Sequence, residues 1–243
     1  MKRRLLAVSD IHGHYQLLEK LMQLVDYRPH YDDLIVCGDL IDRGPDAFKV
    51  MDWFLPGHPG QEAIVLKGNH EAGLEKLLKG EIPLMNYCND FMGGSKTLQS
   101  YLNASDLDIM KHLDFTGRLK LYHVQDGYIF VHAGVSCHQH ISYQSEADLT
   151  LDQAKYYLKE GHLRHREIVV FGHTPTNIIR QQRHEPIPAR SYVWYDSIYR
   201  NKIGIDCGNK EQKRLCCLDL TNGLEYYVGF YPRDTEIRHA TLT

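Results

Sequence analysis

Gly38-Asp39-Leu40-Ile41-Asp42-Arg43-Gly44 is the stretch of the sequence that decides the fold. It follows the apolar run 34–37, which has the length and composition of a buried strand. A helical pattern follows over about 46–55, behind Pro45, a residue that suits a first helical turn. Five specified residues in seven arise by chance at roughly one start position in a few million, taking each residue as about 1 in 20. The stretch is therefore a functional motif set between a strand and a helix.

The same order of strand, polar loop and helix occurs on either side of this motif. Residues 5–8 form an apolar run that ends at Ser9-Asp10, and apolar residues over 17–25 then recur at helical spacing. Residues 63–66 form a third run, which leads to Gly68-Asn69-His70-Glu71 and a helical segment over 74–79. Three such units predict a sheet with parallel central strands.

The remainder of the chain adds helices and further strands. Residues 74–114 are rich in helical patterns with a break at Gly93-Gly94, and we expect them to form an insertion that folds over one face. Further apolar runs predict strands at 128–131, 168–171, 203–205 and 215–218, the last two in antiparallel sheet. No repeat or flexible linker divides the sequence, so we expect a mixed α/β architecture in one domain, residues 1–243.

Composition and charge limit the kinds of function. The 243 residues include 28 Lys and Arg and 31 Asp and Glu, and the net charge of −3 argues against binding a nucleic-acid polymer or a membrane surface. Only four apolar residues follow Met1-Lys2-Arg3-Arg4, too few for an export signal, and no run approaches the roughly 20 of a membrane span. We expect a cytoplasmic protein with six reduced cysteines, among which the adjacent Cys216 and Cys217 pack in the core.

Metal-binding residue types gather where the predicted strands end. They are Asp10 and His12, Asp39 and Asp42, Asn69 and His70, His132, and His173. Because ligands of open α/β sheets bind outside the carboxyl ends of the strands, loops far apart in the sequence can converge on one site. Oxygen and imidazole donors without thiolate suit Mn²⁺, Fe or Zn²⁺ in an open catalytic geometry. A binuclear metal centre at the carboxyl ends of the strands is the natural prediction.

Five motifs together resemble the calcineurin-like metallophosphoesterase superfamily, and within it the serine/threonine phosphoprotein phosphatase branch. They are Asp10-Ile11-His12-Gly13, the stretch 38–44, Gly68-Asn69-His70-Glu71, His132-Ala133-Gly134 and Gly172-His173-Thr174. More weakly, Gly93-Gly94 with Thr97 resembles a substrate-side loop of small bacterial members, which include diadenosine tetraphosphatases. The resemblance covers nearly the whole chain and implies a four-layer α-β-β-α sandwich with two mixed sheets.

The resemblance also implies a set of metal ligands. Asp10 and His12 would hold one cation, Asn69, His132 and His173 the other, and Asp39 would bridge both. A carboxylate can hold two cations at the roughly 3.5–4 Å spacing that lets them share a water, which loses a proton near pH 7 and attacks phosphorus in line. We expect Mn²⁺, with Fe or Zn²⁺ as alternatives, since ligand type does not choose among them.

Residues beside the ligands match the family's catalytic groups. His70 matches the general acid that protonates the departing alkoxide, and Asp42 would orient it. Arg43 would fork onto the phosphoryl oxygens, and Asn69 would also contact the substrate. Glu71 is expected to be structural, because the helix dipole favours a carboxylate in a first turn.

One departure from the family leaves the second phosphate-binding arginine open. Many members carry Trp-x-Arg upstream of the last histidine motif, but residues 149–157 contain neither Trp nor Arg. Arg164 and Arg166 lie nearer to His173, where either could substitute or could instead be a solvated helix-end charge.

The sequence predicts an enzyme, a metal-dependent phosphatase whose substrate class stays open. The first interpretation is a serine/threonine protein phosphatase acting on phosphomonoesters. The alternative is a hydrolase of dinucleoside polyphosphates such as diadenosine tetraphosphate. Stacking aromatics around the site would favour it, and the candidates are Tyr87, Phe91, Tyr192 and Trp194. A catalytically inactive metal-binding regulator is a minor alternative, because every ligand position and the acid are present. The partner is thus a phosphorylated protein or a nucleotide, and the oligomeric state is open.

Overall fold

Eleven strands and eight α-helices are formed by residues 3–136, 139–151, 166–208 and 214–242, which the computed structural model describes. In chain order they are β1 (Arg4–Val8), α1 (Tyr15–Val25), β2 (Asp32–Val36), α2 (Ala47–Trp53), β3 (Ile64–Val65), α3 (Asn69–Leu78), α4 (Leu84–Tyr87), α5 (Gly94–Ser100), α6 (Asp106–Gly117), β4 (Tyr122–Gln125), β5 (Tyr128–Val131), α7 (Glu146–Thr150), β6 (Ile168–Phe171), α8 (Thr176–Gln182), β7 (Trp194–Tyr195), β8 (Lys202–Gly204), β9 (Arg214–Asp219), β10 (Leu224–Gly229) and β11 (Glu236–His239).

Two mixed sheets contain the strands. The first sheet has the order β11-β10-β9-β1-β2-β3, in which β1, β2 and β3 are parallel and β9 to β11 are antiparallel. The second has the order β4-β5-β6-β8-β7, in which β5, β6 and β8 are parallel. Each sheet therefore has three neighbouring parallel strands whose carboxyl ends meet at one edge.

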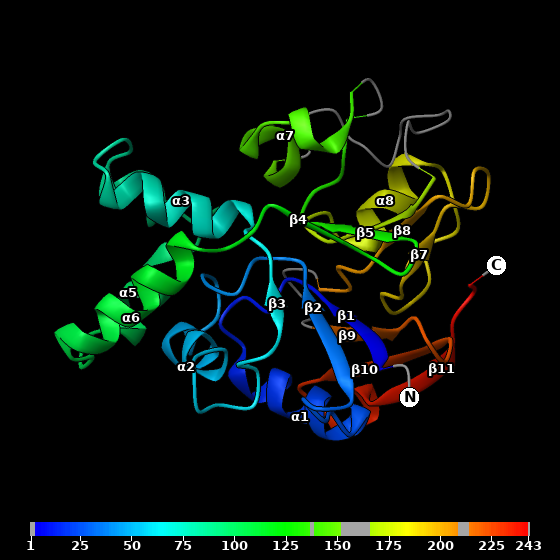
Figure 1. The fold of residues 1–243 in the computed structure, drawn as a ribbon, viewed down its shortest axis with the longest axis horizontal. Helices are drawn as coiled ribbons and strands as arrows, with labels where there is room; N and C mark the ends of the chain where they lie inside the picture. Colours follow the sequence, from blue (N-terminus) through cyan, green and yellow to red (C-terminus); the bar gives the residue numbers. More distant parts are fainter. Residues whose placement is uncertain (1–2, 137–138, 152–165, 209–213, 243) are drawn as a thin grey trace.

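The alternation of side chains along the strands builds the layers. On β1, Leu6 packs in a core with side chains of α1 and α2, whereas Leu5 faces the second sheet and shares a core with Phe130 of β5. The other face of the second sheet packs with Leu149 of α7 and Ile179 of α8. Figure 1 shows helices, two sheets and helices stacked from bottom to top, which confirms the predicted α-β-β-α sandwich.

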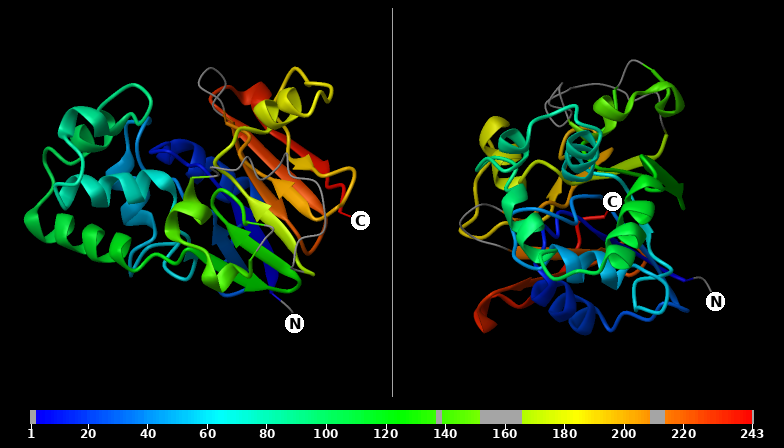
Figure 2. Two further views of the ribbon diagram at one scale, coloured as in Figure 1. Left: turned by 90° about the horizontal axis from the view of Figure 1, so that it is seen from above. Right: turned by 90° about the vertical axis from the view of Figure 1, so that its left-hand side faces the viewer.

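The helix-rich segment stands beside the sheets. We call α3 to α6 (residues 69–117) the helical lobe; it lies at one side of the molecule, next to α2 (Figures 1 and 2). Leu74, Tyr101 and Phe115 pack against the core that α1 and α2 form on the first sheet. The lobe thus extends the outer layer on that face of the first sheet, at the β3 edge.

Two helices begin at other residues than predicted. α2 begins at Ala47 after Asp46, so Pro45 lies ahead of the helix and not in its first turn. α3 begins at Asn69 rather than at Leu74. The first turn of α3 therefore carries part of a predicted site motif, which places those side chains on a helix instead of a loop.

The cysteines confirm the expectation of core packing. Cys216 and Cys217 are successive residues of β9, and their buried side chains belong to the cores on opposite faces of the first sheet. The five described cysteines are free thiols, and Cys137 lies outside the described residues. None of the helices in the described part of the chain has the length and apolarity that crossing a membrane requires.

Candidate metal centre

The structure brings all six predicted ligands together beyond the carboxyl ends of the parallel strands. Asp10 follows β1, Asp39 follows β2 and Asn69 follows β3, while His132 follows β5 and His173 follows β6. His12 Nε2 lies 3.9 Å from Asp10 Oδ1 and 3.5 Å from Asp39 Oδ2. His132 Nε2 lies 3.4 Å from Asp39 Oδ1. The convergence has the simple cause that the parallel strands of both sheets end on the same side.

The donor atoms face one another as acceptors, the arrangement that a cation requires. Asn69 Oδ1 lies 2.9 Å from both His132 Nε2 and His173 Nδ1, which are 3.2 Å apart. His132 Nδ1 donates to the carbonyl of Cys37 at 2.7 Å, so in the neutral imidazole Nε2 carries a lone pair. His12 is held in the same way by the carbonyl of Ile41, at 3.0 Å. Such outer hydrogen bonds fix the tautomer of metal-binding histidines, and this donor set fits a divalent cation.

Asp39 is common to two sets of close donor atoms. One set is His12, Asp39 and His70, and the other is Asp39, His132 and His173, each with its atoms within 4.8 Å of one another. A shared central carboxylate is what the predicted bridging role requires. The first set contains His70, predicted as the acid, because His70 Nε2 lies 3.7 Å from Asp39 Oδ2. Proximity alone therefore leaves His70 with two possible roles, as ligand or as acid.

The backbone of the motifs is held in an uncommon conformation. Ten non-glycine residues of the described chain have positive φ, and six of them are Asp10, His12, Asp39, Asp42, Arg43 and His173. Each such residue costs of order 1–3 kcal/mol and persists only where its surroundings fix it, which happens most often at functional sites. The strain therefore coincides with the candidate centre.

Burial changes the protonation of the ligands. It raises the pKa of Asp39 well above the usual range, with the charge of Asp10 adding to this and His70 opposing it. Burial, together with the neighbouring His132, lowers the pKa of His173 to about 3. His173 is thus neutral at pH 7, the form in which an imidazole binds a metal.

His70 and Asp42 form a buried pair. His70 Nδ1 lies 2.7 Å from Asp42 Oδ2, and both side chains are inaccessible to solvent. Burial by itself lowers the pKa of His70, but the charge of Asp39 and the hydrogen bond and charge of Asp42 outweigh it, so the net pKa is raised. The pair is therefore arranged to hold a proton on the imidazole.

Arg43 reaches over the same donor atoms. Its Nη1 donates to His12 Nε2 at 2.9 Å and its Nη2 to His70 Nε2 at 3.0 Å. The two parallel N–H groups of a guanidinium match two oxygens of a phosphoryl group, which lysine cannot reproduce. The predicted position of Arg43 at the site agrees with this geometry.

Glu71 ties the central motif to α3. Its Oε2 accepts the backbone N–H groups of Asp39 at 3.0 Å and Gly68 at 2.8 Å, and its Oε1 accepts those of Leu40 at 2.8 Å and Ile41 at 3.4 Å. The structural role predicted for Glu71 therefore has a stronger cause than the helix dipole. A Cβ at Gly68 would collide with the Asp39 carboxylate, so the close approach requires glycine there.

Glu71→Gln is expected to lower the free energy of unfolding by roughly 3 kcal/mol, because the amide NH₂ would face two buried backbone donors and leave them unpaired. Urea denaturation measures this effect. The matched control is Glu81→Gln, since Glu81 is an exposed carboxylate after the same helix and should change stability by less than about 0.5 kcal/mol. Equal changes in the two variants would contradict the structural role of Glu71.

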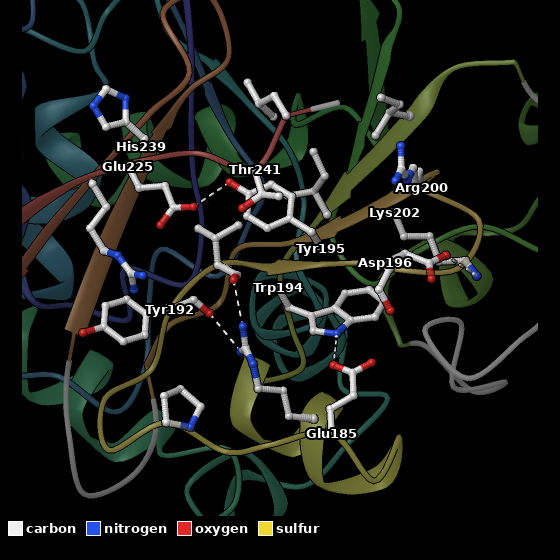
Figure 3. A pocket seen from close by; sticks show the side chains of 18 of the residues that line it. Glu185, Tyr192, Trp194, Tyr195, Asp196, Arg200, Lys202, Glu225, His239 and Thr241 are labelled. Atoms are coloured by element: carbon white, nitrogen blue, oxygen red, sulfur yellow. Dashed lines mark hydrogen bonds and ion pairs between the residues drawn. The ribbon is translucent and has the colours of Figure 1, made fainter.

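Phe91 is the predicted aromatic that lies at the site. A cavity of about 240 Å³ is lined by Asp10, His12, Arg43, Asn69, Phe91 and His173, among others, and Phe91 is 68% exposed. Tyr192 and Trp194 line a separate cavity of about 660 Å³ that shares no lining residue with the first (Figure 3). Tyr87 is fully buried, with its hydroxyl on Asp42. Tyr87 therefore contacts the site from inside the protein, and Tyr192 and Trp194 lie away from it, so none of these three can stack on a substrate there.

Of the two arginines that could have supplied a second phosphate contact, only Arg166 belongs to the described residues, and it does not lie at the site. Arg164 falls outside the described residues. Arg166 is exposed and precedes β6, so it lies at the end of that strand opposite to His173. Arg214, which the sequence did not suggest, lines the site cavity, but its guanidinium donates to Glu236 at 2.6 Å and to the carbonyl of Ser191 at 2.8 Å. Arg43 is therefore the arginine of the site without a carboxylate partner among the described hydrogen bonds and ion pairs.

Comparison with known proteins identifies the family. A family model described as calcineurin-like phosphoesterase matches residues 3–206. The chain therefore belongs to the calcineurin-like phosphoesterase family, which confirms the resemblance seen in its motifs.

Individual relatives are similar to parts or to the whole of the chain. A symmetrical bis(5'-nucleosyl)-tetraphosphatase of Nitrosospira multiformis is 36% identical over 129 residues, which are 53% of this chain and 42% of that protein. The match thus spans less than half of the relative. A crystal structure of a candidate diadenosine tetraphosphatase has a TM-score of 0.64 and 22% identity, covering 96% of each chain. A cold-active protein-tyrosine phosphatase of a psychrophilic Shewanella has a TM-score of 0.56 and 17% identity, covering 98% of this chain and 80% of that one. These two structures show a shared fold only.

Proposed function

We propose that this chain is a metal-dependent phosphoric ester hydrolase whose substrates are dinucleoside polyphosphates. The observation that carries the hydrolase assignment is the place of Asp39, whose two carboxylate oxygens face opposite ligand sets, at 3.5 Å from His12 Nε2 and 3.4 Å from His132 Nε2. Two divalent cations held there supply the Lewis acidity that activates water and neutralises phosphoryl oxygens. We propose Mn²⁺, with Fe or Zn²⁺ as alternatives.

The proposed roles follow the geometry. The ligands are Asp10, His12, Asp39, Asn69, His132 and His173, as the sequence predicted. His70 is the proposed general acid. Asp42 holds its Nδ1 proton at 2.7 Å, and its Nε2, which accepts an N–H of Arg43 in the structure, would carry the transferred proton once that N–H turns to the substrate. Arg43 and Asn69 are the proposed contacts to the phosphoryl group. The lone pair of His12 Nε2 can bind only one partner at a time. If it bound a cation, the Arg43 N–H that it now accepts would become available to a substrate oxygen.

Two observations favour a nucleotide substrate over a phosphoprotein. Curated relatives around 30–36% identical to this chain are named symmetrical bis(5'-nucleosyl)-tetraphosphatases. In the structure, the exposed ring of Phe91 lines the same cavity as Arg43 and the ligands, so a base can stack on the aromatic while its phosphates reach the arginine. The first interpretation, a serine/threonine protein phosphatase, is thus less well supported than its alternative.

The deciding experiment compares kcat/KM for diadenosine tetraphosphate and a phosphoserine peptide, with Mn²⁺ present. We expect at least tenfold preference for the dinucleotide. Phe91→Ala should raise KM for the dinucleotide by about tenfold, the loss expected for one stacked base, and leave KM for 4-nitrophenyl phosphate unchanged. Tyr31→Ala is the matched control, since this exposed ring precedes β2 and lies at the end opposite to Asp39. Preference for the peptide would overturn the substrate assignment, and no turnover of the dinucleotide, the peptide or 4-nitrophenyl phosphate would overturn the hydrolase.

We also propose that residues 1–243 act as one domain. β1 and β10 come from opposite ends of the chain and lie in the same sheet. Leu5 of β1 and Tyr227 of β10 share the core that joins the two sheets. Neither part of the chain could bury this core without the other.

A further inference from the structure

Two hydroxyl groups of the helical lobe converge on Asp42. Tyr87 Oη, at the end of α4, donates to Asp42 Oδ1 at 2.7 Å, and Thr97 Oγ1, in α5, donates to the same oxygen at 2.6 Å. The backbone N–H of Asp42 donates to Thr97 Oγ1 at 2.8 Å. All three side chains are buried, Asp42 and Tyr87 fully. The sequence indicated neither residue as a partner of the acid.

The division of partners between the two oxygens of Asp42 defines what the hydroxyls do. Oδ2 faces His70 Nδ1, and Oδ1 receives both hydroxyls. Three donors stabilise a carboxylate that solvent cannot reach, and they fix its rotation so that Oδ2 stays in line with the imidazole. Burial and the charge of Asp42 raise the pKa of Tyr87, so its hydroxyl keeps the proton it donates.

The same part of the lobe holds the neighbouring arginine. The backbone N–H of Arg43 donates to the carbonyl of Gly93 at 3.2 Å. A Cβ at Gly94 would collide with the ring of Tyr87, so glycine is required for the tyrosine to reach Asp42. The sequence pattern Gly93-Gly94 with Thr97 therefore contacts the acid pair and the Arg43 backbone.

We propose that Tyr87 and Thr97 are positioning residues that act through Asp42 to orient His70 as a proton donor. This inference rests on the proposed hydrolase function. A purely structural role would mean that the two hydroxyls only attach the lobe to the sandwich. If the hydroxyls position His70, losing one should change the environment of the His70 Nδ1 proton and slow the hydrolysis of substrates whose leaving group needs protonation. If they only attach the lobe, neither should change.

The experiment uses Tyr87→Phe and Thr97→Val, which remove one hydroxyl each and keep the shape of the side chain. Thr97→Ser is the control that retains the hydroxyl. Tyr101→Phe is the matched control for loss of a tyrosine hydroxyl in the same lobe, because Tyr101 Oη bonds His112 Nδ1 at 2.7 Å and does not contact Asp42. Two readouts are combined. The first is the downfield proton resonance of His70 Nδ1–H in the Mg²⁺-supplemented protein, which is assigned by its loss in His70→Gln. The second is kcat for phenyl phosphate and for 4-nitrophenyl phosphate with Mn²⁺.

We expect Tyr87→Phe and Thr97→Val both to move the His70 resonance. Tyr87→Phe should lower kcat for phenyl phosphate about tenfold, the effect of one lost hydrogen bond on a charged group. Thr97→Val should lower it at least as much, because it also leaves the backbone N–H of Asp42 without its acceptor. The loss for 4-nitrophenyl phosphate, whose leaving group needs little protonation, should stay below about threefold. Thr97→Ser and Tyr101→Phe should leave both readouts at the wild-type value. An unmoved resonance in both test variants overturns the positioning role whatever the activity, and so do equal losses on the two esters. Failure of the wild-type protein to hydrolyse diadenosine tetraphosphate as well as both esters instead contradicts the proposed function, and the resonance still decides the positioning role.

Discussion

Asp39→Asn is expected to abolish most of the activity of this chain and to weaken both cation sites at once. In the structure, the backbone N–H of His70 donates to Asp39 Oδ1 at 3.2 Å. The asparagine amide has the size of the carboxylate and can still accept this N–H, but it lacks the charge that two cations would share. Loss of a residue that only hydrogen-bonds a metal ligand typically lowers metal affinity roughly 10–100-fold. Because Asp39 would be a ligand itself, the affinity for both cations should fall by more than this. We expect kcat/KM to fall by roughly 10³-fold or more, about 4 kcal/mol of transition-state stabilisation. Calorimetric titration with Mn²⁺ and initial rates measure the two effects.

Asp196→Asn is the matched control for this prediction. Asp196 is as buried as Asp39, at 2% exposed each, but it lies in the separate large cavity beside Lys202 (Figure 3). This variant should keep both Mn²⁺ affinities. A fall in one affinity alone after Asp39→Asn would show that the carboxylate serves a single cation. Two cations bound with unchanged affinity would remove Asp39 from the centre altogether.

The convergence of Asp10, Asp39 and Asn69 could be predicted from the sequence because it depends only on neighbouring parallel strands of one sheet. An apolar run such as 5–8, with no polar position, fits only a strand buried on both faces, and parallel strands place their following loops at one edge. Asp10 and Asp39 follow such runs in the first sheet, so their proximity required no knowledge of side-chain packing. His132 follows a strand of the second sheet, and the packing of that sheet on the first was implied by the family resemblance.

Contacts between the helical lobe and the sandwich could not be predicted in this way. Periodicity identified the helices of the lobe but not the direction in which they pack, so the hydroxyls of Tyr87 and Thr97 on Asp42 were missed. The choice of Tyr192 and Trp194 as stacking residues was wrong for a similar reason. Tyr192 precedes β7 and Trp194 lies in it, at the edge of the second sheet. The spacing of residues along the sequence does not predict how far this edge lies from the loops after β1 and β2.

His70→Ala is expected to lower kcat by about 10²–10⁴-fold for phenyl phosphate and by a much smaller factor for 4-nitrophenyl phosphate, because only the poorer leaving group needs a proton in the transition state. The prediction matters because His70 Nε2, 3.7 Å from Asp39 Oδ2, is also close enough to serve as a ligand. Its Nδ1 contact with Asp42 is compatible with either role, so geometry does not separate them.

The two roles of His70 separate when leaving-group dependence and cation binding are measured on one variant. As the acid, His70 can be removed with both Mn²⁺ affinities kept, and Asp42→Asn should then add little to His70→Ala, since Asp42 acts through the imidazole. As a ligand, its removal should weaken the cation that His12 holds and lower kcat equally for both esters. His12→Ala is the reference for that second pattern, because His12 Nδ1 is fixed by the Ile41 carbonyl and its Nε2 has no contact with Asp42 among the described hydrogen bonds. Equal losses on the two esters after His70→Ala, together with one weakened cation, would therefore reassign His70 from proton donor to metal ligand.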